Sequence, residues 1–338
     1  MIYIHKKLIS IAAFLLLLIS SCNMAQQRQK EVDVHIGFNG LNMEFLKGTP
    51  PKNTFEGEKF PVLIKAENKG AYGINSPEKS YLSIGVEKDY TKDVQLLAGG
   101  NVGLLQLGLD KIAEFSIEGR SQINLRGGEE VISYSIEAGR IDPQSERHQS
   151  AVIATLCYPY KTTLETTACI DTDANNLRPG KKACSSQDMI FGNGQGAPLA
   201  VTKIEARMLP TQQDKIKPQF LIFVEDKSNG LVIKKESVKE FCTISGTSHE
   251  NFNIVYVKAF LSGKELECQL DKEPEKEELG HIKLKDKKDI IRCYTSGKSN
   301  FASDIDKSLD PYLTTLKIEL DYGYTQSMSA NYAIERVS

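Results

Sequence analysis

The feature that most constrains the fold of this chain is an internal repeat. Residues 156 to 170 (LCYPYKTTLETTACI) align without gaps on residues 320 to 334 (LDYGYTQSMSANYAI), at a constant offset of 164. In both copies apolar and polar residues alternate, which is the period-2 pattern of a strand with one buried face. We therefore expect two copies of one β-rich domain, and in each copy this block forms a closing hairpin. In the first copy the hairpin turns at Thr163.

Two further blocks repeat in the same order. Residues 60 to 70 align on residues 220 to 230 at an offset of 160, which places Asn68 of the first copy opposite Ser228 of the second. Each of these blocks reads as a strand that runs into a polar turn ending in glycine. Between the two matches, residues 124 to 134 resemble residues 283 to 293. Three blocks in one order predict copies of about 140 residues each.

Helix signals are weak along the chain. The best candidate, Asp93 to Asp110, is interrupted by Gly99, Gly100 and Gly103, each of which costs about 1 kcal/mol inside a helix. We therefore expect a loop with short strands there. Strands separated by turn signals, in domains of this length, favour antiparallel β-sandwiches.

The predicted fold class is all-β, with two tandem immunoglobulin-like antiparallel β-sandwiches after a lipoprotein signal peptide. The expected organisation is a signal peptide (1–21), a lipidated tether (22–31), a first domain (32–172), a linker (173–197) and a second domain (198–338). Alternating apolar residues place the first strand of domain one at Val32, Val34, Ile36 and Phe38.

The N-terminus predicts export and a lipid anchor. Lys6 and Lys7 precede an apolar run that is too short to span a bilayer as a mature helix, and the run ends in Ile19-Ser-Ser-Cys22. This ending resembles the bacterial and archaeal lipobox, which implies that the thiol of Cys22 is lipidated. The alternative is an ordinary cleaved signal with an incidental cysteine. The expected location is the outer face of the cell membrane, the periplasm or the cell surface.

Charge and hydropathy limit the partners that we expect. Removal of the signal peptide takes away Lys6 and Lys7, which leaves 40 basic and 44 acidic residues. A mildly acidic surface gives no electrostatic case for binding nucleic acid. No other apolar stretch approaches the 18 residues of a membrane span. The lipid on Cys22 is thus the only predicted attachment to the membrane.

The remaining six cysteines predict three disulfides, since an even number in an exported protein favours oxidation. Structural zinc and free thiols are the alternatives, but no cysteine pair or histidine has zinc-ligand spacing. Fifteen pairings are possible. Folding the predicted hairpin about Thr163 brings Cys157 opposite Cys169. The next expected pair is Cys268 with Cys293, which leaves Cys184 with Cys242.

Three polar segments are candidate sites. Asp171-Thr-Asp-Ala-Asn-Asn176 has the oxygen-rich alternation of a calcium loop but lacks its glycine and final glutamate, so a solvated turn is favoured over calcium. Gly192 to Gly196 precedes a strand rather than a helix, which favours a flexible hinge over a phosphate loop. In Asp271 to Asp289, 13 of 19 residues are charged. This composition predicts a solvated protruding loop, with partner binding as the alternative.

No motif predicts catalysis, a metal or a cofactor. The chain has no nucleophile elbow, and Ser248-His249 stands without a third group to orient the imidazole. The tyrosine pairs Tyr158/Tyr160 and Tyr322/Tyr324 each share one strand face. They form either a binding strip or part of a sandwich core with the hydroxyls at its edge.

A family resemblance rests on the repeated blocks. The pattern Phe-x-Val-x-Ile-x-x-x-Asn-x-Gly (Phe60 to Gly70), a Gly-Gly-Glu-Glu edge before a strand (Gly127 to Ile132) and the Tyr-rich closing block look like immunoglobulin-like surface domains of the CARDB and NEW3 type. The chain also resembles uncharacterised archaeal and bacterial cell-surface lipoproteins. The resemblance implies roles in adhesion, assembly or spacing and no known catalysis.

The sequence thus predicts a non-enzymatic, membrane-anchored surface lipoprotein that presents a protein-binding or adhesive surface. A structural subunit of a surface layer or filament is one form of this hypothesis. Its expected partners are the membrane, through Cys22, and an extracellular protein or a second copy of the chain. The alternative is a solute- or polysaccharide-binding lipoprotein accessory to a transporter or surface enzyme, which needs a pocket at the junction of the two domains.

Overall fold

The computed structural model describes residues 32–97, 101–107, 110–211, 214–243, 248–273 and 276–337. Val34–Ser338 forms one compact unit. The predictions of a signal peptide, a lipid on Cys22 and a tether lie outside the described residues.

The described part of the chain is nearly all β. Its first half contains β1 (Leu41–Phe45), β2 (Asn53–Phe55), β3 (Lys59–Asn68), β4 (Ser80–Val86), β5 (Thr91–Leu97), β6 (Gly103–Leu107), β7 (Asp110–Phe115), β8 (Glu129–Ala138) and β9 (Arg147–Ile170). Its second half contains β10 (Met189–Ile190), β11 (Leu199–Pro210), β12 (Lys215–Asp226), β13 (Leu231–Ile233), β14 (Ile254–Leu261), β15 (Lys264–Glu265), β16 (Glu267–Cys268), β17 (Asp271–Glu273), β18 (Lys276–Lys283), β19 (Lys288–Tyr294), β20 (Ile305–Asp306) and β21 (Tyr312–Glu335). The helical segments are α2 (Val238–Phe241) and the 3₁₀ turns η2 (Lys88–Tyr90), η3 (Lys235–Ser237) and η4 (His249–Asn251).

Among the described residues these strands form three sheets. A four-stranded sheet has the order β1-β3-β8-β5, and a six-stranded sheet has the order β10-β11-β12-β19-β16, with β20 beside β12. The 11-stranded sheet has the order β17-β18-β14-β21-β9-β4-β7-β6, with β2 and β13 beside β21 and β15 beside β14. All of these strand pairs are antiparallel except β2 with β21.

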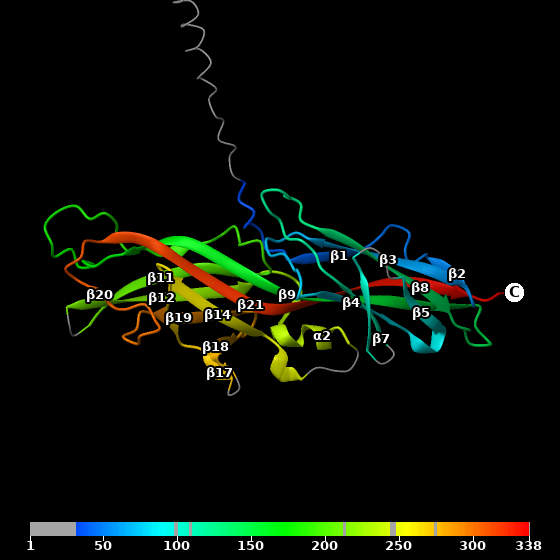
Figure 1. Cartoon of the computed structure of the whole chain (residues 1–338). Coiled ribbons are helices and arrows are strands. Elements are labelled where there is room, and N and C mark those ends of the chain that lie inside the picture. Colours follow the sequence, from blue (N-terminus) through cyan, green and yellow to red (C-terminus); the bar gives the residue numbers. More distant parts are fainter. Residues whose placement is uncertain are drawn as a thin grey trace, which may run out of the picture. The chain divides into compact units, whose positions relative to one another are not determined.

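Two long strands form the middle of the largest sheet. Strands β9 and β21 have 24 residues each, or about 80 Å at roughly 3.3 Å per residue. They pair antiparallel from end to end, with Pro159 opposite Gly323. The repeat offset of 164 also maps Pro159 onto Gly323, so this pair lies on a pseudo-twofold axis that relates the two copies. Figure 1 shows both strands running through the two ends of the fold.

The predicted hairpin about Thr163 is wrong, because β9 continues through it as a single strand. No glycine or asparagine interrupts residues 147 to 170, and Pro159 is tolerated within the strand. The partner that a returning strand would have supplied is β21 of the other copy, where Thr163 lies opposite Glu319. The repeat was therefore read correctly as strand but was given the wrong partner.

Each end of the 11-stranded sheet is covered by one of the smaller sheets. In the first sandwich the four-stranded sheet covers the end containing β4 and β7, and the Tyr134 hydroxyl donates to the Leu82 carbonyl across the layers at 2.8 Å. In the second sandwich the six-stranded sheet covers the end containing β14 and β18. There Thr162 of β9 donates to the carbonyl of Leu199 at 2.6 Å. The two sandwiches share β9 and β21, and one continuous hydrophobic cluster runs through both.

This sharing corrects the predicted division into domains. The prediction of antiparallel β-sandwiches is confirmed at the level of an all-β fold. Residues 32–172 and 198–338 do not form separate units, because Val34–Ser338 is one compact unit. The expected first strand is also displaced. Residues 34 to 38 make only an isolated bridge at Gly37, whose positive φ of 93° interrupts an extended strand. Among the described residues the first strand is β1.

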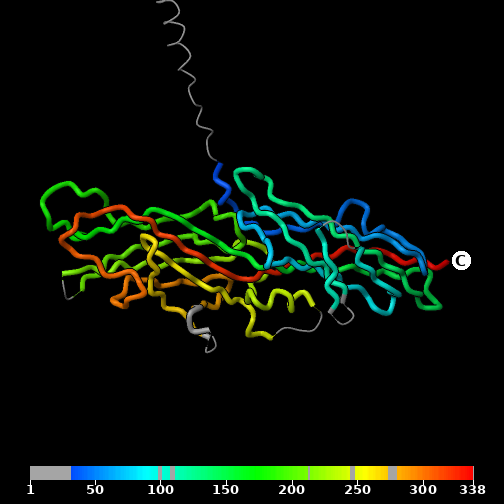
Figure 2. Tube along the Cα trace, in the orientation of Figure 1, coloured from blue at the N-terminus to red at the C-terminus, as the bar shows by residue number. Residues whose placement is uncertain are grey.

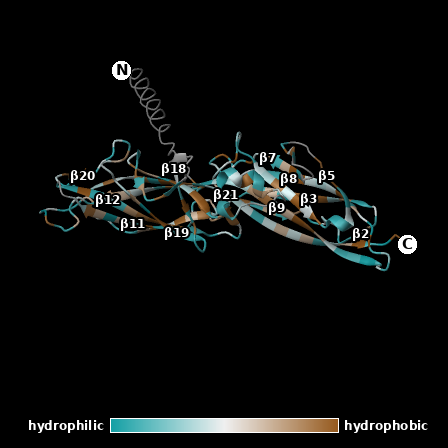
Figure 3. Ribbon diagram, turned by 90° about the horizontal axis from the view of Figure 1, so that it is seen from below, coloured by the Kyte–Doolittle hydropathy of each residue, from teal (hydrophilic) through white to brown (hydrophobic). Residues whose placement is uncertain are grey.

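Burial along the strands follows the predicted alternation. In β3 and β12 every second residue is buried over most of the strand, and hydrophobic and hydrophilic residues alternate along both sandwiches in Figure 3. The strand pairing shows that the alignment of residues 60 to 70 on residues 220 to 230 is wrong by two residues. Ile64 pairs with Ile132 and Ile222 pairs with Ile291, so Ile64 corresponds to Ile222. A shift of two keeps every side chain on its predicted face.

The connector between the copies is packed rather than free. Its residues 189 and 190 form β10, and Gly37 accepts a hydrogen bond from Gly196 at 2.9 Å. A Cβ at Gly194 would lie 2.3 Å from the Gly37 carbonyl oxygen, so the close approach requires glycine. The prediction of a flexible hinge at Gly192 to Gly196 is wrong for this reason. The earlier part of the connector (green in Figure 2) folds back beside the start of β21, where Arg178 donates to the carbonyl of Leu309.

The charged segment from Asp271 to Asp289 is also more ordered than predicted. It contains β17, β18 and the start of β19, instead of one long loop. Asp271 pairs with His281, and Ile282 pairs with the buried Val255 of β14. The few apolar residues of this segment therefore attach it to the large sheet. The prediction of short strands in Asp93 to Asp110 is confirmed, because this segment contains most of β5, all of β6 and the first residue of β7.

Candidate functional site

The four repeat tyrosines lie at the pseudo-twofold axis. Tyr158 is opposite Tyr324 and Tyr160 is opposite Tyr322 on the paired strands. All four are at most 1% exposed. They therefore form part of the core, and the interpretation as a binding strip is wrong. Burial raises the pKa of each phenol well above its usual range.

Two of these tyrosines hold equivalent turns by different chemistry. Tyr160 donates to the Asn68 side-chain oxygen at 3.2 Å, and Tyr324 donates to the Asp226 carboxylate at 3.1 Å. Asp226 is thus the structural counterpart of Asn68, in place of Ser228. Burial is the largest influence on Asp226 and raises its pKa, although Lys287 and the Tyr324 hydroxyl oppose this effect.

The outward face of the large sheet carries a pocket at the same axis. Its volume is about 420 Å³. The first copy contributes the segment around Glu78 and Tyr81. The second copy contributes η3, α2, Tyr256 and Asp321. Tyr81 and Tyr256 occupy equivalent register positions, because they pair with Cys157 and Asp321, which match at the repeat offset. The pocket therefore lies where the two copies meet.

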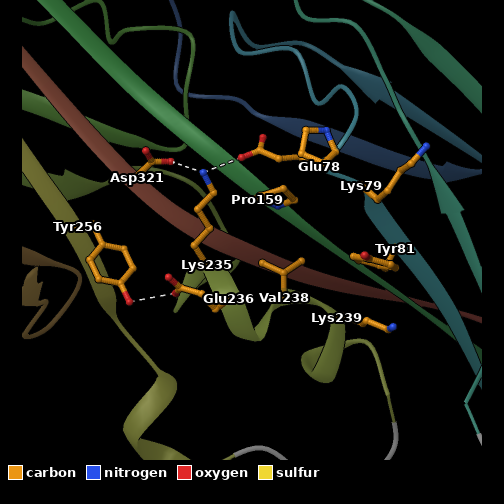
Figure 4. A pocket seen from close by; sticks show the side chains of 11 residues that line it. Glu78, Lys79, Tyr81, Pro159, Lys235, Glu236, Val238, Lys239, Tyr256 and Asp321 are labelled. Carbon is orange, nitrogen blue, oxygen red and sulfur yellow. Dashed lines mark hydrogen bonds and ion pairs between the residues drawn. The ribbon is translucent and has the colours of Figure 1, made fainter. Parts of the chain in front are cut away.

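Lys235 links the two copies within this pocket. Its amine lies 2.6 Å from Glu78 and 2.7 Å from Asp321, and each of the three side chains is about a quarter exposed. Burial alone would lower the pKa of Lys235, but the hydrogen bonds and charges of Glu78 and Asp321 outweigh it and raise that pKa. Figure 4 shows the Lys235 amine between the two carboxylates and the Tyr256 hydroxyl directed at Glu236.

The carboxylates have further donors. Tyr72 donates to Glu78 at 2.6 Å, and Lys161 lies 3.1 Å from Asp321. This network of compensated charges joins the two copies. Pro77, Pro159 and Val238 supply apolar surface between the charges. The pocket can therefore accept a small ligand that has both apolar and hydrogen-bonding groups.

The segment that closes the pocket is attached at two points. The Cys157–Cys242 disulfide ties the end of α2 to β9, and Lys235 ties η3 to Asp321 of β21. Between these points Val238 packs directly on Gly323, where a Cβ would lie only 2.4 Å from its side chain. Glycine is therefore required on the pseudo-twofold axis.

The six cysteines that follow Cys22 form three disulfides, as expected. They pair as Cys157–Cys242, Cys169–Cys184 and Cys268–Cys293. The predicted pairs Cys157–Cys169 and Cys184–Cys242 are wrong, because Cys157 and Cys169 lie far apart on one continuous strand. Cys268–Cys293 was predicted and joins opposite residues of β16 and β19. Cys22 lies outside the described residues.

The calcium candidate is occupied by protein groups. Lys182 contacts both Asp171 oxygens at 3.0 Å, and the Asp173 carboxylate accepts from the backbone of Leu177 and Arg178. The segment is the expected turn, although Asp171 and Asp173 are buried rather than solvated. In the described ranges no group of three or more His, Cys, Asp or Glu side chains could hold a metal ion.

The predicted Ser248-His249 pair lies at a turn. The Ser248 hydroxyl accepts from the Glu250 backbone at the start of η4, and His249 is exposed. Sequence reasoning missed Lys235, Glu78 and Asp321, because no motif connects them. The one available signal was the extra length of the second copy between its first block and Tyr256. Of the helices within the described ranges, none is long and apolar enough to cross a bilayer.

No family model matches the chain, and no curated protein matches it significantly. Among solved structures it is similar to the C-terminal domain of the Streptococcus agalactiae AgI/II polypeptide BspA, at 7% identity over 88% of this chain and 100% of that chain, with a TM-score of 0.22. It is also similar to the Streptococcus pneumoniae pilus backbone protein RrgB, at 8% identity over 84% of this chain and 49% of that chain, with a TM-score of 0.23. It is similar as well to the collagen adhesin of S. aureus, at 9% identity over 90% of this chain and 94% of that chain, with a TM-score of 0.18. The resemblance to CARDB and NEW3 domains stays a prediction.

Proposed function

We propose that this protein is a non-enzymatic, lipid-anchored protein of the cell surface or periplasm that presents a protein-binding or adhesive surface. The observation that carries the proposal is the presence of three disulfides among the six cysteines of the described residues. Disulfides persist in oxidising compartments outside the cytoplasm. The lipobox-like sequence ending at Cys22 supports the same location.

The fold is suited to presenting a surface. Because β9 and β21 run through both sandwiches, a force or a contact at one end reaches the other through continuous backbone pairing. The disulfide at Cys157 and the ion pairs of Lys235 fix the junction from its outward face. A structural subunit of a surface layer or filament is one form of this function.

The test is mass spectrometry of the full-length protein extracted from membranes, without reduction. We expect a lipid-sized mass increase on the peptide that begins at Cys22 and three disulfide-linked peptide pairs. Cys22→Ala should release the protein from the membrane fraction with its disulfides intact. An unmodified Cys22 in membrane-extracted protein, or free thiols at the six other cysteines, would contradict the proposal.

The pocket at the junction favours a second candidate, a solute- or polysaccharide-binding lipoprotein accessory to a transporter or surface enzyme. The pocket has the size of small-molecule sites, which are about 300 to 1,000 Å³. Calorimetric titration with a panel of neutral and acidic oligosaccharides tests this candidate. Val238→Asp should remove binding, while the matched surface change Val131→Asp should not. If no oligosaccharide of the panel binds, the second candidate is contradicted and the first remains as the proposed function.

A further inference from the structure

One surface loop carries apolar side chains into solvent. Residues 121–127 (SQINLRG) lie between the bridge at Ile117 and the start of β8, and we name them the 121–127 loop. Ile123 is 99% exposed, more than any other large hydrophobic residue that the structure describes, and Leu125 is 48% exposed. Arg126, the single charged residue of the loop, is also exposed. Covering these two apolar side chains would remove hydrophobic surface from water, which is favourable.

The polar groups of the loop are bonded within it. The Ser121 N–H donates to the Asn124 carbonyl at 2.8 Å, and the Asn124 N–H donates to the Ser121 hydroxyl at 3.0 Å. The Asn124 side chain donates to the Gly127 carbonyl at 3.0 Å. At the base of the loop the Gly128 N–H donates to the Glu118 carbonyl at 2.9 Å. Backbone groups that are already paired cost less to remove from water, so the tip of the loop can enter an apolar phase.

The loop begins beside the start of the described chain. Arg120, the residue before the loop, donates to the Val34 carbonyl at 2.7 Å and to the Ile36 carbonyl. Figure 2 shows the two segments side by side. Cys22 precedes Val34 by 12 residues, which span at most about 43 Å when fully extended. A lipid on Cys22 would therefore keep a membrane surface within reach of the 121–127 loop.

The base of the loop and the junction pocket lie on opposite faces of the large sheet. The Arg120 N–H donates to the Gly70 carbonyl at 2.8 Å. A Cβ at Gly70 would lie only 1.9 Å from the Tyr160 hydroxyl oxygen, so this part of the chain covers the Tyr160 side of β9. Pro159, the preceding residue of β9, lines the pocket. Successive strand residues point to opposite faces, so the sheet separates the loop from the pocket.

We propose that the 121–127 loop is a second membrane contact, which inserts Ile123 and Leu125 into the bilayer that holds the lipid on Cys22. This inference rests on the lipid anchor of the proposed function. The tether holds the loop at a high effective concentration near that bilayer, which makes the bilayer the favoured apolar partner. Arg126 would meet the lipid phosphates at the depth of the headgroups. With the loop bound, the junction pocket faces away from the membrane.

The test uses a single introduced tryptophan, since the chain contains none. Ile123→Trp is made in the full-length protein, which is extracted from membranes and reconstituted into phosphatidylethanolamine–phosphatidylglycerol vesicles with or without brominated acyl chains. We expect the brominated lipid to quench the tryptophan emission. Ile153→Trp is the matched control, because Ile153 is 48% exposed and shares the outward face of β9 with Pro159. Its emission should be the same in both kinds of vesicle.

A second variant tests the apolar contact itself. Leu125→Asp, added to Ile123→Trp, places a charge in the tip of the loop. It should weaken the contact at least about tenfold and restore the emission, while the lipid mass on the Cys22 peptide stays unchanged. Quenching that persists in this double variant would contradict insertion of the tip.

The outcomes separate this inference from the proposed function. An unquenched Ile123→Trp protein whose Cys22 lipid is confirmed by mass spectrometry would overturn the inference and leave the proposed lipid anchor intact. Equal quenching of Ile123→Trp and Ile153→Trp would also overturn it. An emission shift to shorter wavelength without quenching would place a protein on the loop, which contradicts a membrane contact. A Cys22 peptide without lipid would overturn both the proposed function and the inference.

Discussion

Tyr324→Phe should destabilise the protein more than Tyr160→Phe, although the two residues are equivalent in the repeat. The Tyr324 hydroxyl donates to the buried Asp226 carboxylate at 3.1 Å and accepts from the Gly230 N–H at 2.9 Å. Its removal weakens the solvation of a buried charge and leaves a buried N–H without that acceptor. A hydrogen bond to a charged group contributes about 1.5 to 3 kcal/mol, and an unsatisfied buried group costs about 1 to 3 kcal/mol. The expected loss is therefore about 3 to 5 kcal/mol.

The Tyr160 hydroxyl has less demanding partners. It can donate to the Asn68 side chain or to the Gly196 carbonyl, each at 3.2 Å. Without it, Asn68 still accepts from the Gly70 N–H at 3.1 Å, and Gly196 still accepts from the Ala71 N–H at 2.8 Å. Both acceptors are neutral and keep one partner, so Tyr160→Phe should cost about 1 kcal/mol.

The assay is urea unfolding at neutral pH with the disulfides intact, followed by far-ultraviolet circular dichroism. The two variants differ from the wild type by the same single oxygen, so each serves as the control for the other. We expect Tyr324→Phe to lose about 2 kcal/mol or more beyond the loss of Tyr160→Phe. Equal losses would refute the reasoning, because they would show that the charge on Asp226 does not depend on this hydroxyl.

The pH dependence of the same pair follows from Asp226. Burial raises its folded-state pKa, so the protonated form is favoured in the fold. The stability from this group is present below the unfolded pKa and is lost as pH rises through the folded pKa. The Tyr324 hydroxyl lowers that pKa. The gap between Tyr324→Phe and the wild type should therefore be smallest in acid and widen as pH rises.

Three further changes have definite expected outcomes. Asp226→Asn should reduce the dependence of stability on acid pH, and an unchanged slope in urea unfolding at several pH values would contradict this. Gly323→Val would force Val238 and α2 off the sheet, at a cost of about 1 to 3 kcal/mol, seen as faster hydrogen exchange in α2. Unaltered exchange would show that the helix accommodates the side chain. Changing Cys169 and Cys184 together to Ser opens a 15-residue loop and should cost about 3 kcal/mol in non-reducing urea unfolding. A loss below about 1 kcal/mol would contradict the loop-entropy estimate.

The sequence predicted the strands of the fold better than their partners. Alternation is a local property, so the repeated blocks around Phe60 and Tyr158 identified strands and buried faces correctly. Pairing depends on which edges meet in space, and nothing local distinguishes a hairpin at Thr163 from one strand paired with a distant copy. The same error produced the wrong partner for Cys157. Cys268–Cys293 was predicted correctly, because residues 25 apart lie on neighbouring strands of one sheet.

The sequence did not predict the junction pocket itself. The alternative function required a pocket where the two copies meet, and the structure has one there. Its residues could not be named, since Glu78, Lys235 and Asp321 are far apart in sequence and each is ordinary in its own segment. Only the antiparallel alignment of β9 with β21 places the two copies so that these side chains converge.

The pocket arises where the two copies stop being alike. Cys157 and Asp321 occupy equivalent positions on the outward face, one on β9 and one on β21. Both hold the segment of η3 and α2, Cys157 through its disulfide with Cys242 and Asp321 through its ion pair with Lys235. Two symmetry-equivalent positions thus hold one segment of the second copy. This segment crosses the axis, so the first copy cannot place an equivalent segment there. Because Gly323 leaves room for that segment while Pro159 faces the pocket, the asymmetry extends to the axis itself. A ligand bound in this pocket would therefore contact both copies. Because the pocket itself is asymmetric, the ligand would bind in a single orientation relative to them.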